Sequence, residues 1–402
     1  MTAAERYGTE RLSEVPKAPM FRSGKHTISS RDPTQGQVVR EFAQSMHTQV
    51  YLDKHFIEPV DLDERGMFTD EYNDRATYVV AENGQRYSAC RYIAATKKEG
   101  LMSLPTPRHF ALDAKEVQDV AGTRLVDLRA SEVVEISGLV SVKREDKEVG
   151  HSGDLNATWL LHSAALRESL DQGHKLWLLN THETLIRQLE IILGPDQIHR
   201  LGAPMDYMGS MTVPVAINPQ SVVTSALNDD SIHGEAKRHH LMEALPGVNA
   251  DKLSKETKAA LERRGIPYVK TPRLERLVKS PKTWVNTALG AYALARAAPL
   301  PAIDQFHGDW RVFLALDLVT VAPYTWGITT AATGTTRRRR LVGASAAVGG
   351  FATPYAYLIG TGDHYPPIVD GAIAGFVGLA TLQEVAKNRR NKRIFRELEA
   401  VK

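Results

Sequence analysis

The sequence has little of several features that would narrow its function at once. Cys90 is the single cysteine among 402 residues. No disulfide can therefore form within the chain, and a reducing compartment is expected. Lys and Arg number 50 and Asp and Glu 47, which gives a net charge of +3 with neutral histidines. A charge so close to zero excludes a strongly basic nucleic-acid-binding protein, and no nucleic-acid partner is expected.

Other absent features exclude further classes of protein. Residues 1–22 carry mixed charges and have no apolar core of signal-peptide length, so no secretory signal is expected. Neither a phosphate-binding Gly-Lys-Ser motif nor a serine nucleophile elbow occurs. His233, His239 and His240 lie in polar sequence without cysteines or spaced carboxylates. We expect solvated histidines there and no metal site.

The mean hydropathy of −0.28 averages two unlike parts of the chain. Charged residues are dense and evenly mixed up to about Pro281. Beyond that point the stretches 341–362 and 371–383 contain no Asp, Glu, Lys or Arg. Both are rich in Gly, Ala, Val and Leu, a composition typical of packed membrane helices.

Four apolar segments of this C-terminal part approach the ~20 residues that cross a bilayer. They are Trp284–Ile303, Val312–Ala332, Leu341–Ile359 and Ile368–Val385. We expect an all-α transmembrane module of about four helices, with a bundle of buried soluble helices as the alternative. Asp317 and Asp370 lie within these segments, and an acidic residue inside a span suggests a polar path or helix pairing.

Basic clusters predict the topology of this module. Arg337–Arg340 separates the second and third segments, and Lys387–Arg393 follows the fourth. Positively charged loops stay in the cytoplasm. Four crossings would then leave both ends of the chain in the cytoplasm, as a multi-pass protein of the inner or plasma membrane. The lipid bilayer is thus a predicted partner.

The first two hundred residues alternate strand and helix patterns. An Asn-Gly pair between two β-branched runs predicts a hairpin over 77–94. Strands and helices then follow in turn: a strand over 132–142, a helix over 155–171, a strand over 175–180, a helix over 183–193 and a strand over 211–217. This order predicts an α+β domain with one mixed sheet and flanking helices.

A series of short motifs, in order along residues ~35–225, resembles a known family. They are Arg40 with Phe42 and Tyr51, Asp70-Glu71-Tyr72-Asn73-Asp74, Tyr78-Val79-Val80-Ala81 with Gly84, Arg91, Leu104-Pro105-Thr106, Glu135-Ile136-Ser137, and Leu201-Gly202-Ala203-Pro204 with Tyr207-Met208-Gly209. Together they resemble the acyl-homoserine-lactone synthases and, more broadly, the N-acyl amino acid synthases, which share the GCN5-related N-acyltransferase fold.

The resemblance implies an acyl thioester donor, on acyl carrier protein or coenzyme A, and a small amine acceptor such as an amino acid. No permanently bound cofactor is implied. One departure stands out: the lactone synthases continue Glu-x-Ser with Arg, whereas this chain has Gly138. That difference argues against a lactone product. The resemblance and the hydropathy pattern together divide the chain into an N-terminal extension (1–34), an acyltransferase-like domain (35–227), a polar linker or surface helix (228–282), the membrane module (283–387) and a basic cytoplasmic tail (388–402).

Within the acyltransferase-like domain, two residues are candidates for catalysis. Glu135 lies among Val133, Val134 and Ile136, and an apolar setting raises the basicity of a carboxylate, so it could deprotonate the amine. The alternative is a structural carboxylate that pairs with an arginine or with buried backbone. Gly138 could allow close approach of the thioester carbonyl to a backbone N–H, or it could form an ordinary bulge.

The remaining candidates bind substrates. Asp70 and Asp74 could hold the acceptor's ammonium group, or could form a turn or helix cap. Arg91 could pair with Asp70 or with an acceptor carboxylate, and the resemblance adds Arg40 and Ser137 to this set. For the donor, Lys143, Arg144 and Lys147 precede a predicted helix N-terminus, where a phosphate or an acidic carrier protein could bind. A solvated loop is the alternative.

The sequence as a whole predicts a membrane-tethered N-acyltransferase that moves a fatty acyl group from a thioester to an amine. Tethering suits a lipid-like donor or product that enters the bilayer. One alternative is an acyl-homoserine-lactone synthase that uses S-adenosylmethionine. The other is a membrane transporter or sensor whose N-terminal domain binds an acyl ligand without turnover.

Overall fold

The computed structural model describes residues 18–20, 27–83, 86–143, 157–241, 244–272, scattered positions between 275 and 291, 307–334, 337–362 and 367–400. The chain divides into two compact units. The first consists of residues 1–270 together with 394–402, and the second of residues 271–393. The first unit contains the sheet, and the second consists of helices.

A mixed sheet forms the centre of the first unit. The strands are β1 Thr27–Ser29, β2 Ala76–Glu82, β3 Arg86–Ala94, β4 Val133–Lys143, β5 Leu176–Thr181, β6 His199–Arg200, β7 Met205–Tyr207 and β8 Ser210–Ile217. Their order is β1-β2-β3-β4-β5-β8-β6, and β7 pairs with β8. All pairs are antiparallel except β4 and β5. The predicted α+β fold with one mixed sheet is confirmed.

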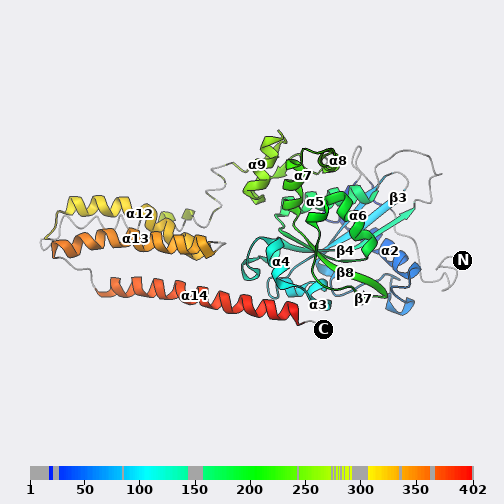
Figure 1. Cartoon of the computed structure of the whole chain (residues 1–402), viewed down its shortest axis with the longest axis horizontal. Helices are drawn as coiled ribbons and strands as arrows, with labels where there is room; N and C mark the ends of the chain where they lie inside the picture. Colours follow the sequence, from blue (N-terminus) through cyan, green and yellow to red (C-terminus); the bar gives the residue numbers. More distant parts are fainter. Residues whose placement is uncertain are drawn as a thin grey trace. The chain divides into compact units, whose positions relative to one another are not determined.

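Helices cover both faces of this sheet (Figure 1). One face packs against α5 Ala157–Gln172, α6 Glu183–Leu193, α7 Pro219–Asn228, α8 Ile232–Leu241 and α9 Lys255–Arg263. The other packs against α2 Gly36–Asp53, α3 Pro105–His109 and α4 Ala114–Ala121. Alternation along the strands decides which face each residue enters. Val134 and Ile136 therefore join the α5 side, whereas Glu135 faces the α2 side.

Local signals in the sequence fix the ends of several helices. Asp113 caps α4 by accepting the N–H of Glu116, and Gly122 ends it in the left-handed conformation at φ 63°. The His182 side chain caps α6, and Asn218 caps α7 just before Pro219. Asp and Asn are favoured at helix starts, Pro at the first helical position and Gly just after a helix end, whereas the His182 cap is not one that the sequence predicts. One-turn 3-10 helices complete the unit: η1 Pro59–Asp61, η2 Asn73–Arg75, η3 Leu101–Ser103, η4 Leu125–Asp127, η5 Ala130–Glu132, η6 Pro195–Gln197 and η7 Ala250–Lys252.

Residues 228–270, expected to be a polar linker or surface helix, form part of the first unit. Helices α8 and α9 and a small parallel pair, β9 Val248–Asn249 with β10 Tyr268–Val269, lie there. Leu245, Val248 and Leu261 are fully buried in the core on the α5 side. The apolar residues of this stretch come in groups of one to three among charged residues, which is why the sequence looks polar. Strand β1 likewise brings part of the expected N-terminal extension into the sheet.

The end of the chain also belongs to the first unit. Leu398 is fully buried in the core on the α2 side. Its carbonyl accepts a hydrogen bond from the N–H of Leu112 at 2.8 Å. Ile394 and Phe395 pack against the same core. The basic tail predicted over 388–402 therefore ends in an apolar contact with the sheet unit.

The second unit contains α12 Trp310–Thr333, α13 Arg337–Thr361 and most of α14 Pro367–Glu399. Within the described residues, α12 and α13 are long and apolar enough to cross a membrane, judged by length and composition. The predicted segments 312–332 and 341–359 lie inside these helices. The segment 368–385 lies inside α14, and most of Trp284–Ile303 falls outside the described residues. Two of the four expected spans therefore have a described apolar helix of sufficient length.

Helices α12 and α13 pack very closely, side by side (Figure 1). A Cβ atom added to Gly327 would lie 2.4 Å from the backbone nitrogen of Ala347, and one added to Gly343 would lie 2.5 Å from that of Ala331. Close approach through small residues is typical of helix pairs in membranes. At the start of α13 the buried Arg340 forms an ion pair with Glu384 of α14.

Candidate active site

A cavity opens where the central strands separate. Strand β4 pairs with β5 only from Val133 to Glu135, and the parallel pairing ends at Glu135 opposite Leu178. Beyond that point the two strands diverge, and a cavity of about 300 Å³ lies between them. Its walls include the next residues of both strands, Ile136–Leu139 and Leu179–Thr181.

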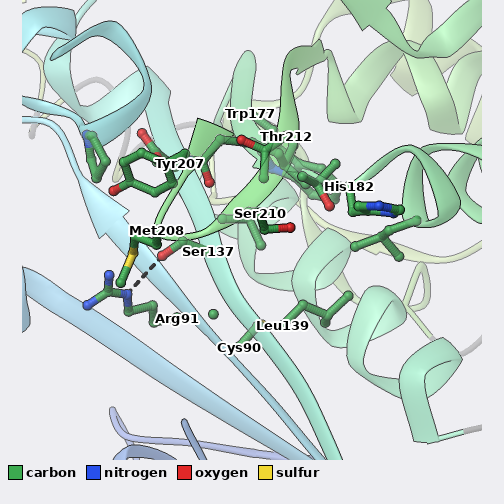
Figure 2. A pocket seen from close by; sticks show the side chains of 18 of the residues that line it. Cys90, Arg91, Ser137, Leu139, Trp177, His182, Tyr207, Met208, Ser210 and Thr212 are labelled. Carbon is green, nitrogen blue, oxygen red and sulfur yellow. Dashed lines mark hydrogen bonds between the residues drawn. The ribbon is translucent and has the colours of Figure 1, made fainter. Parts of the chain in front are cut away.

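The cavity has two chemically different ends. At one end lie polar and aromatic side chains on the α2 side of the sheet: Tyr51, Asp70, Arg91, Glu135, Ser137 and Tyr207. At the other end lie apolar side chains of α5, β5 and α6: Leu161, Ala165, Trp177, Leu179, Leu185 and Leu189. Figure 2 shows Arg91, Tyr207 and Met208 at one end and His182 at the other. We call the second end the apolar arm.

Glu135 is fully buried at the junction of these two ends. Its Oε2 atom accepts the backbone N–H of Thr106 at 2.8 Å, and its Oε1 atom is enclosed without a hydrogen-bond partner. Burial is the main cause that raises the pKa of Glu135 to about 8, against the opposing effects of the Thr106 hydrogen bonds and of Arg91. A carboxyl group with a pKa close to neutrality can both take and release a proton.

Arg91 organises the polar end through its guanidinium group. Its Nε donates to the Ser137 hydroxyl at 2.8 Å, as Figure 2 shows. One terminal nitrogen donates to the Asn73 side chain at 2.9 Å, and the other to Asp70 at 2.6 Å. Burial is the largest single influence on the pKa of Arg91 and lowers it, but the hydrogen bond and the opposite charge of Asp70 together outweigh burial, and the pKa is raised above its usual range. The guanidinium therefore stays charged and holds three polar side chains around the cavity.

Gly138 forms a β-bulge in β4. Ala89 pairs with Val140 and Arg91 with Ser137, so Gly138 and Leu139 together lie opposite Cys90 alone. Gly138 has a φ of +59°, which favours glycine, and an added Cβ would lie 2.9 Å from the ring of His47. The bulge re-aims the strand beside the cavity, and His47 occupies the space where a side chain at position 138 would lie.

His47 lies directly behind Gly138, a contact that sequence reasoning missed. It lies on α2, is buried, and its Nε2 atom has no hydrogen-bond partner. Burial, assisted by the positive charge of Arg91, lowers the pKa of His47 to about 3, so the ring is neutral. Its ring also lies beside those of Tyr51 and Tyr78. The one signal in the sequence is its position on the helix that contains Arg40.

Tyr207 is a second residue whose role the sequence did not suggest, although it belongs to one of the family-like motifs. It lines the cavity, and its ring lies 5.6 Å from that of Phe110. Burial and then the neighbouring Glu135 raise the pKa of Tyr207 above its ordinary value. Its hydroxyl therefore keeps its proton and can donate a hydrogen bond.

The other predicted residues divide into those at the cavity and those away from it. Asp70, Arg91, Glu135, Ser137 and Gly138 all line it. Arg40 instead donates to the backbone carbonyls of Asn73 and Ala76, at 2.8 and 3.0 Å, and supports the segment that carries the Arg91 partners. Asp74 is exposed in η2.

The predicted donor-binding residues lie at the edge of what is described. Lys143 is the last residue of β4, opposite Arg86. Arg144 and Lys147 lie outside the described residues, as does most of the loop expected to meet a phosphate. Among the residues that the structure describes, no group of three or more His, Cys, Asp or Glu side chains could hold a metal ion.

The structure is similar to acyl-homoserine lactone synthases, the family that the sequence motifs resemble. Three such structures are a CoA-dependent acyl-homoserine lactone synthase, BjaI, with SAM and isopentyl-CoA (17% identity, 62% of this chain and 93% of that chain covered, TM-score 0.33), the AHL synthase LasI (18%, 49% and 91%, 0.33), and TofI in a ternary complex with an inhibitor and MTA (19%, 51% and 97%, 0.32). No protein-family model matches the chain, and no curated protein sequence does. At these identities and TM-scores the likeness carries no substrate or residue role to this chain.

Proposed function

We propose that the chain is an N-acyltransferase, which moves a fatty acyl group from a thioester to the amine of an amino acid or a similar small acceptor. The observation that carries this proposal is the unpaired Oε1 atom of Glu135, enclosed at the junction of a polar and an apolar cavity end. The apolar arm suits an acyl chain, and the polar end suits a small charged acceptor. The two substrates would then meet beside a carboxyl group that can take a proton.

The chemistry follows from the residues around that junction. The amine nitrogen attacks the thioester carbonyl carbon, a carbon–nitrogen bond forms, and the carbon–sulfur bond breaks. The ionised form of Glu135, a fraction that grows as pH approaches its pKa of about 8, takes the proton that the amine must lose. The hydroxyl of Tyr207 is a neutral donor in the same cavity and can stabilise the departing sulfur. The products are an amide and a free thiol.

The acceptor would be oriented by the group of side chains around Arg91. Asp70 and Arg91 already pair with each other at 2.6 Å, so together they offer a nearly neutral, polar wall. Such a wall suits an acceptor that carries both an ammonium and a carboxylate group, as an amino acid does. Gly138 stands where the lactone synthases carry Arg, and we infer an acceptor different from theirs.

Thiol release tests the enzyme directly. Purified full-length protein, given acyl-CoA or acyl carrier protein with amino acids or S-adenosylmethionine, should release free thiol. Glu135→Gln should lower kcat/KM by about 10²–10⁴-fold, because a general base typically supplies that factor. Glu132→Gln is the matched control, since Glu132 precedes the same strand but pairs with Lys175 at 2.8 Å.

Two outcomes would contradict the proposal. One is the absence of thiol release with every donor and acceptor. The other is a Glu135→Gln variant with unchanged turnover, which would show that Glu135 is not the base. Titration calorimetry with a thioether analogue of acyl-CoA should give the same Kd for wild type and Glu135→Gln, which separates loss of chemistry from loss of binding.

We further propose that the second unit tethers the enzyme to a membrane through four crossings. Residues 270 and 394 belong to one folded unit, so both ends of the segment between them lie on the same side of a bilayer. The number of crossings must then be even. If α12, α13 and α14 each cross, a fourth crossing is needed before α12, and Trp284–Ile303 is the apolar segment available. Arg337–Arg340 would lie on the cytoplasmic side, with the acyltransferase unit.

Cysteine labelling in cells tests this topology. Cys90 is buried, and burial raises the pKa of its thiol to about 12, so it should give little background with maleimides. A cysteine replacing His307 should react with an impermeant maleimide from outside. Cysteines replacing Thr335 and Ala400 should react only after permeabilisation. Labelling of positions 307 and 335 from the same side would contradict four crossings.

A further inference from the structure

The apolar arm of the cavity contains one polar ring that nothing yet described accounts for. His162 lies on α5 and lines the cavity next to Leu161 and one turn before Ala165. Its Nδ1 atom is enclosed and has no hydrogen-bond partner. Within the described residues, no hydrogen bond or ion pair to the ring is present.

The ring of His162 is neutral. Burial lowers its pKa to about 4, so at neutral pH one ring nitrogen carries a proton and the other offers a lone pair. An enclosed polar atom without a partner destabilises the folded protein, and a partner brought by a ligand removes that penalty. A ligand that fills the arm with hydrocarbon alone leaves the penalty in place.

A second histidine of the same cavity shows what a satisfied ring looks like. His182 also lines the cavity, but its Nδ1 accepts the backbone N–H of Thr184 at 3.2 Å and caps α6. The Nδ1 atom of His182 is therefore already paired and serves as the cap of α6. His162 lies in the interior of α5, where no helix end needs a cap.

We propose that His162 selects an acyl chain that carries a hydroxyl or keto oxygen, which hydrogen-bonds to the ring inside the apolar arm. This inference rests on the proposed acyltransferase function, because the occupant of the arm is taken to be the acyl chain. A hydroxyl oxygen can pair with either ring nitrogen, and a keto oxygen with the protonated one. A site built to pair with a polar group rejects a ligand that lacks it, because its own polar atom then stays unpaired.

The test compares acyl-CoA donors of one chain length that differ in a single oxygen: saturated, 2-hydroxy, 3-hydroxy and 3-oxo. Wild type should use the best oxygenated donor about tenfold to a hundredfold more efficiently, in kcat/KM, than the saturated donor. His162→Leu should abolish or reverse that preference, and His162→Gln, which keeps donor and acceptor atoms, should retain part of it. His174→Leu is the matched control and should leave the ratio unchanged, because His174 is also buried but does not line the cavity, and its Nδ1 atom pairs with the Ser169 hydroxyl at 3.1 Å.

A second readout does not depend on turnover. Thioether analogues of the same donors cannot transfer their acyl group, and their Kd values should follow the same order in wild type and lose it in His162→Leu. An equal Kd for saturated and oxygenated analogues in wild type would overturn the role of His162. An unchanged ratio in His162→Leu would do so as well. Absence of thiol release by wild type with all donors would instead count against the acyltransferase itself, whatever the Kd values.

Discussion

Buried charge serves different purposes in the two units. In the sheet unit the carboxyl group of Glu135 is fully buried with one oxygen unpaired, at the wall of a cavity. In the helical unit the guanidinium of Arg340 is 4% exposed and pairs with Glu384, while it also donates to the carbonyl of Gly334 at 2.7 Å. We propose that the first group meets a substrate in the cavity, whereas the second joins two helices. Both groups are buried, and what distinguishes them is whether their polar atoms have hydrogen-bond partners. A buried polar atom without a partner marks a candidate site, whereas a fully paired one has a structural role.

Glycine shows the same contrast. Gly138 lies at φ +59° in a bulge that shapes the cavity, with His47 in the place of its missing side chain. Gly327 and Gly343 lie within helices and allow two backbones to approach. Gly138 therefore shapes a strand beside the cavity, whereas Gly327 and Gly343 let two helices pack closely.

The largest expected difference between the two buried groups is in the pH dependence of stability, to which the unpaired Glu135 should contribute. Glu135 has an ordinary pKa of 4.5 in the unfolded chain and about 8 in the folded one, so between these values only the folded state holds the proton. The contribution of Glu135 to stability should therefore fall as pH rises from about 4.5 to about 8, by at most about 5 kcal/mol at ~1.4 kcal/mol for each pH unit. His47 and His162, whose pKa values burial lowers to about 3 and about 4, act in the opposite direction up to about pH 6.5 and remain in a Glu135→Gln variant. The fall should therefore appear in the difference in stability between wild type and Glu135→Gln, measured as thermal unfolding of the full chain at each pH across this range.

The control for this pH effect is Glu183→Gln. The Arg200 side chain donates to exposed Glu183 and holds the pKa of that carboxyl below its ordinary value. Its contribution is lost only as pH falls below that value, so the slope between pH 4.5 and 8 should stay as in wild type. A difference between wild type and Glu135→Gln that stays constant across the range would contradict the raised pKa of Glu135.

How far the sequence could predict these features depends on how local each one is. Strand β4 and the Glu135–Gly138 run were predictable because alternation and β-branched residues mark a buried strand within a dozen residues. His47 and His162 were not, since their contacts lie across the sheet on α2 and α5, and a helical histidine by itself shows no partner. The same holds for Leu398, whose burial depends on a unit that begins more than a hundred residues earlier in the chain.

Arg340→Met should have the next largest effect. Removing one member of a buried ion pair leaves the other uncompensated and typically costs about 3–5 kcal/mol. Thermal denaturation of the full-length variant in detergent should therefore begin at a lower temperature than that of wild type. The double variant Arg340→Met with Glu384→Met should recover most of that loss, because neither charge remains. A single variant as stable as wild type would mean that the pair does not hold α13 and α14 together.

Gly138→Ala should give the smallest effect of the three, and Gly122→Ala is its matched control. Both glycines have a φ near +60°, so alanine at either position meets the same backbone strain, about 1–2 kcal/mol. An added Cβ meets nothing within 4 Å at Gly122 but lies 2.9 Å from the His47 ring at Gly138. The extra loss of stability at position 138, from overpacking, should be about 1–3 kcal/mol.

A second substitution separates the two contributions at position 138. His47→Ala removes the ring that the new methyl group would meet. The double variant Gly138→Ala with His47→Ala should therefore recover part of the unfolding temperature lost in Gly138→Ala, which measures the coupling between the two sites. Thiol release should not recover with stability if the bulge itself aims β4 at the substrates. Equal losses in Gly138→Ala and Gly122→Ala would show that His47 moves aside freely. In that case Gly138 would be required for its backbone conformation alone.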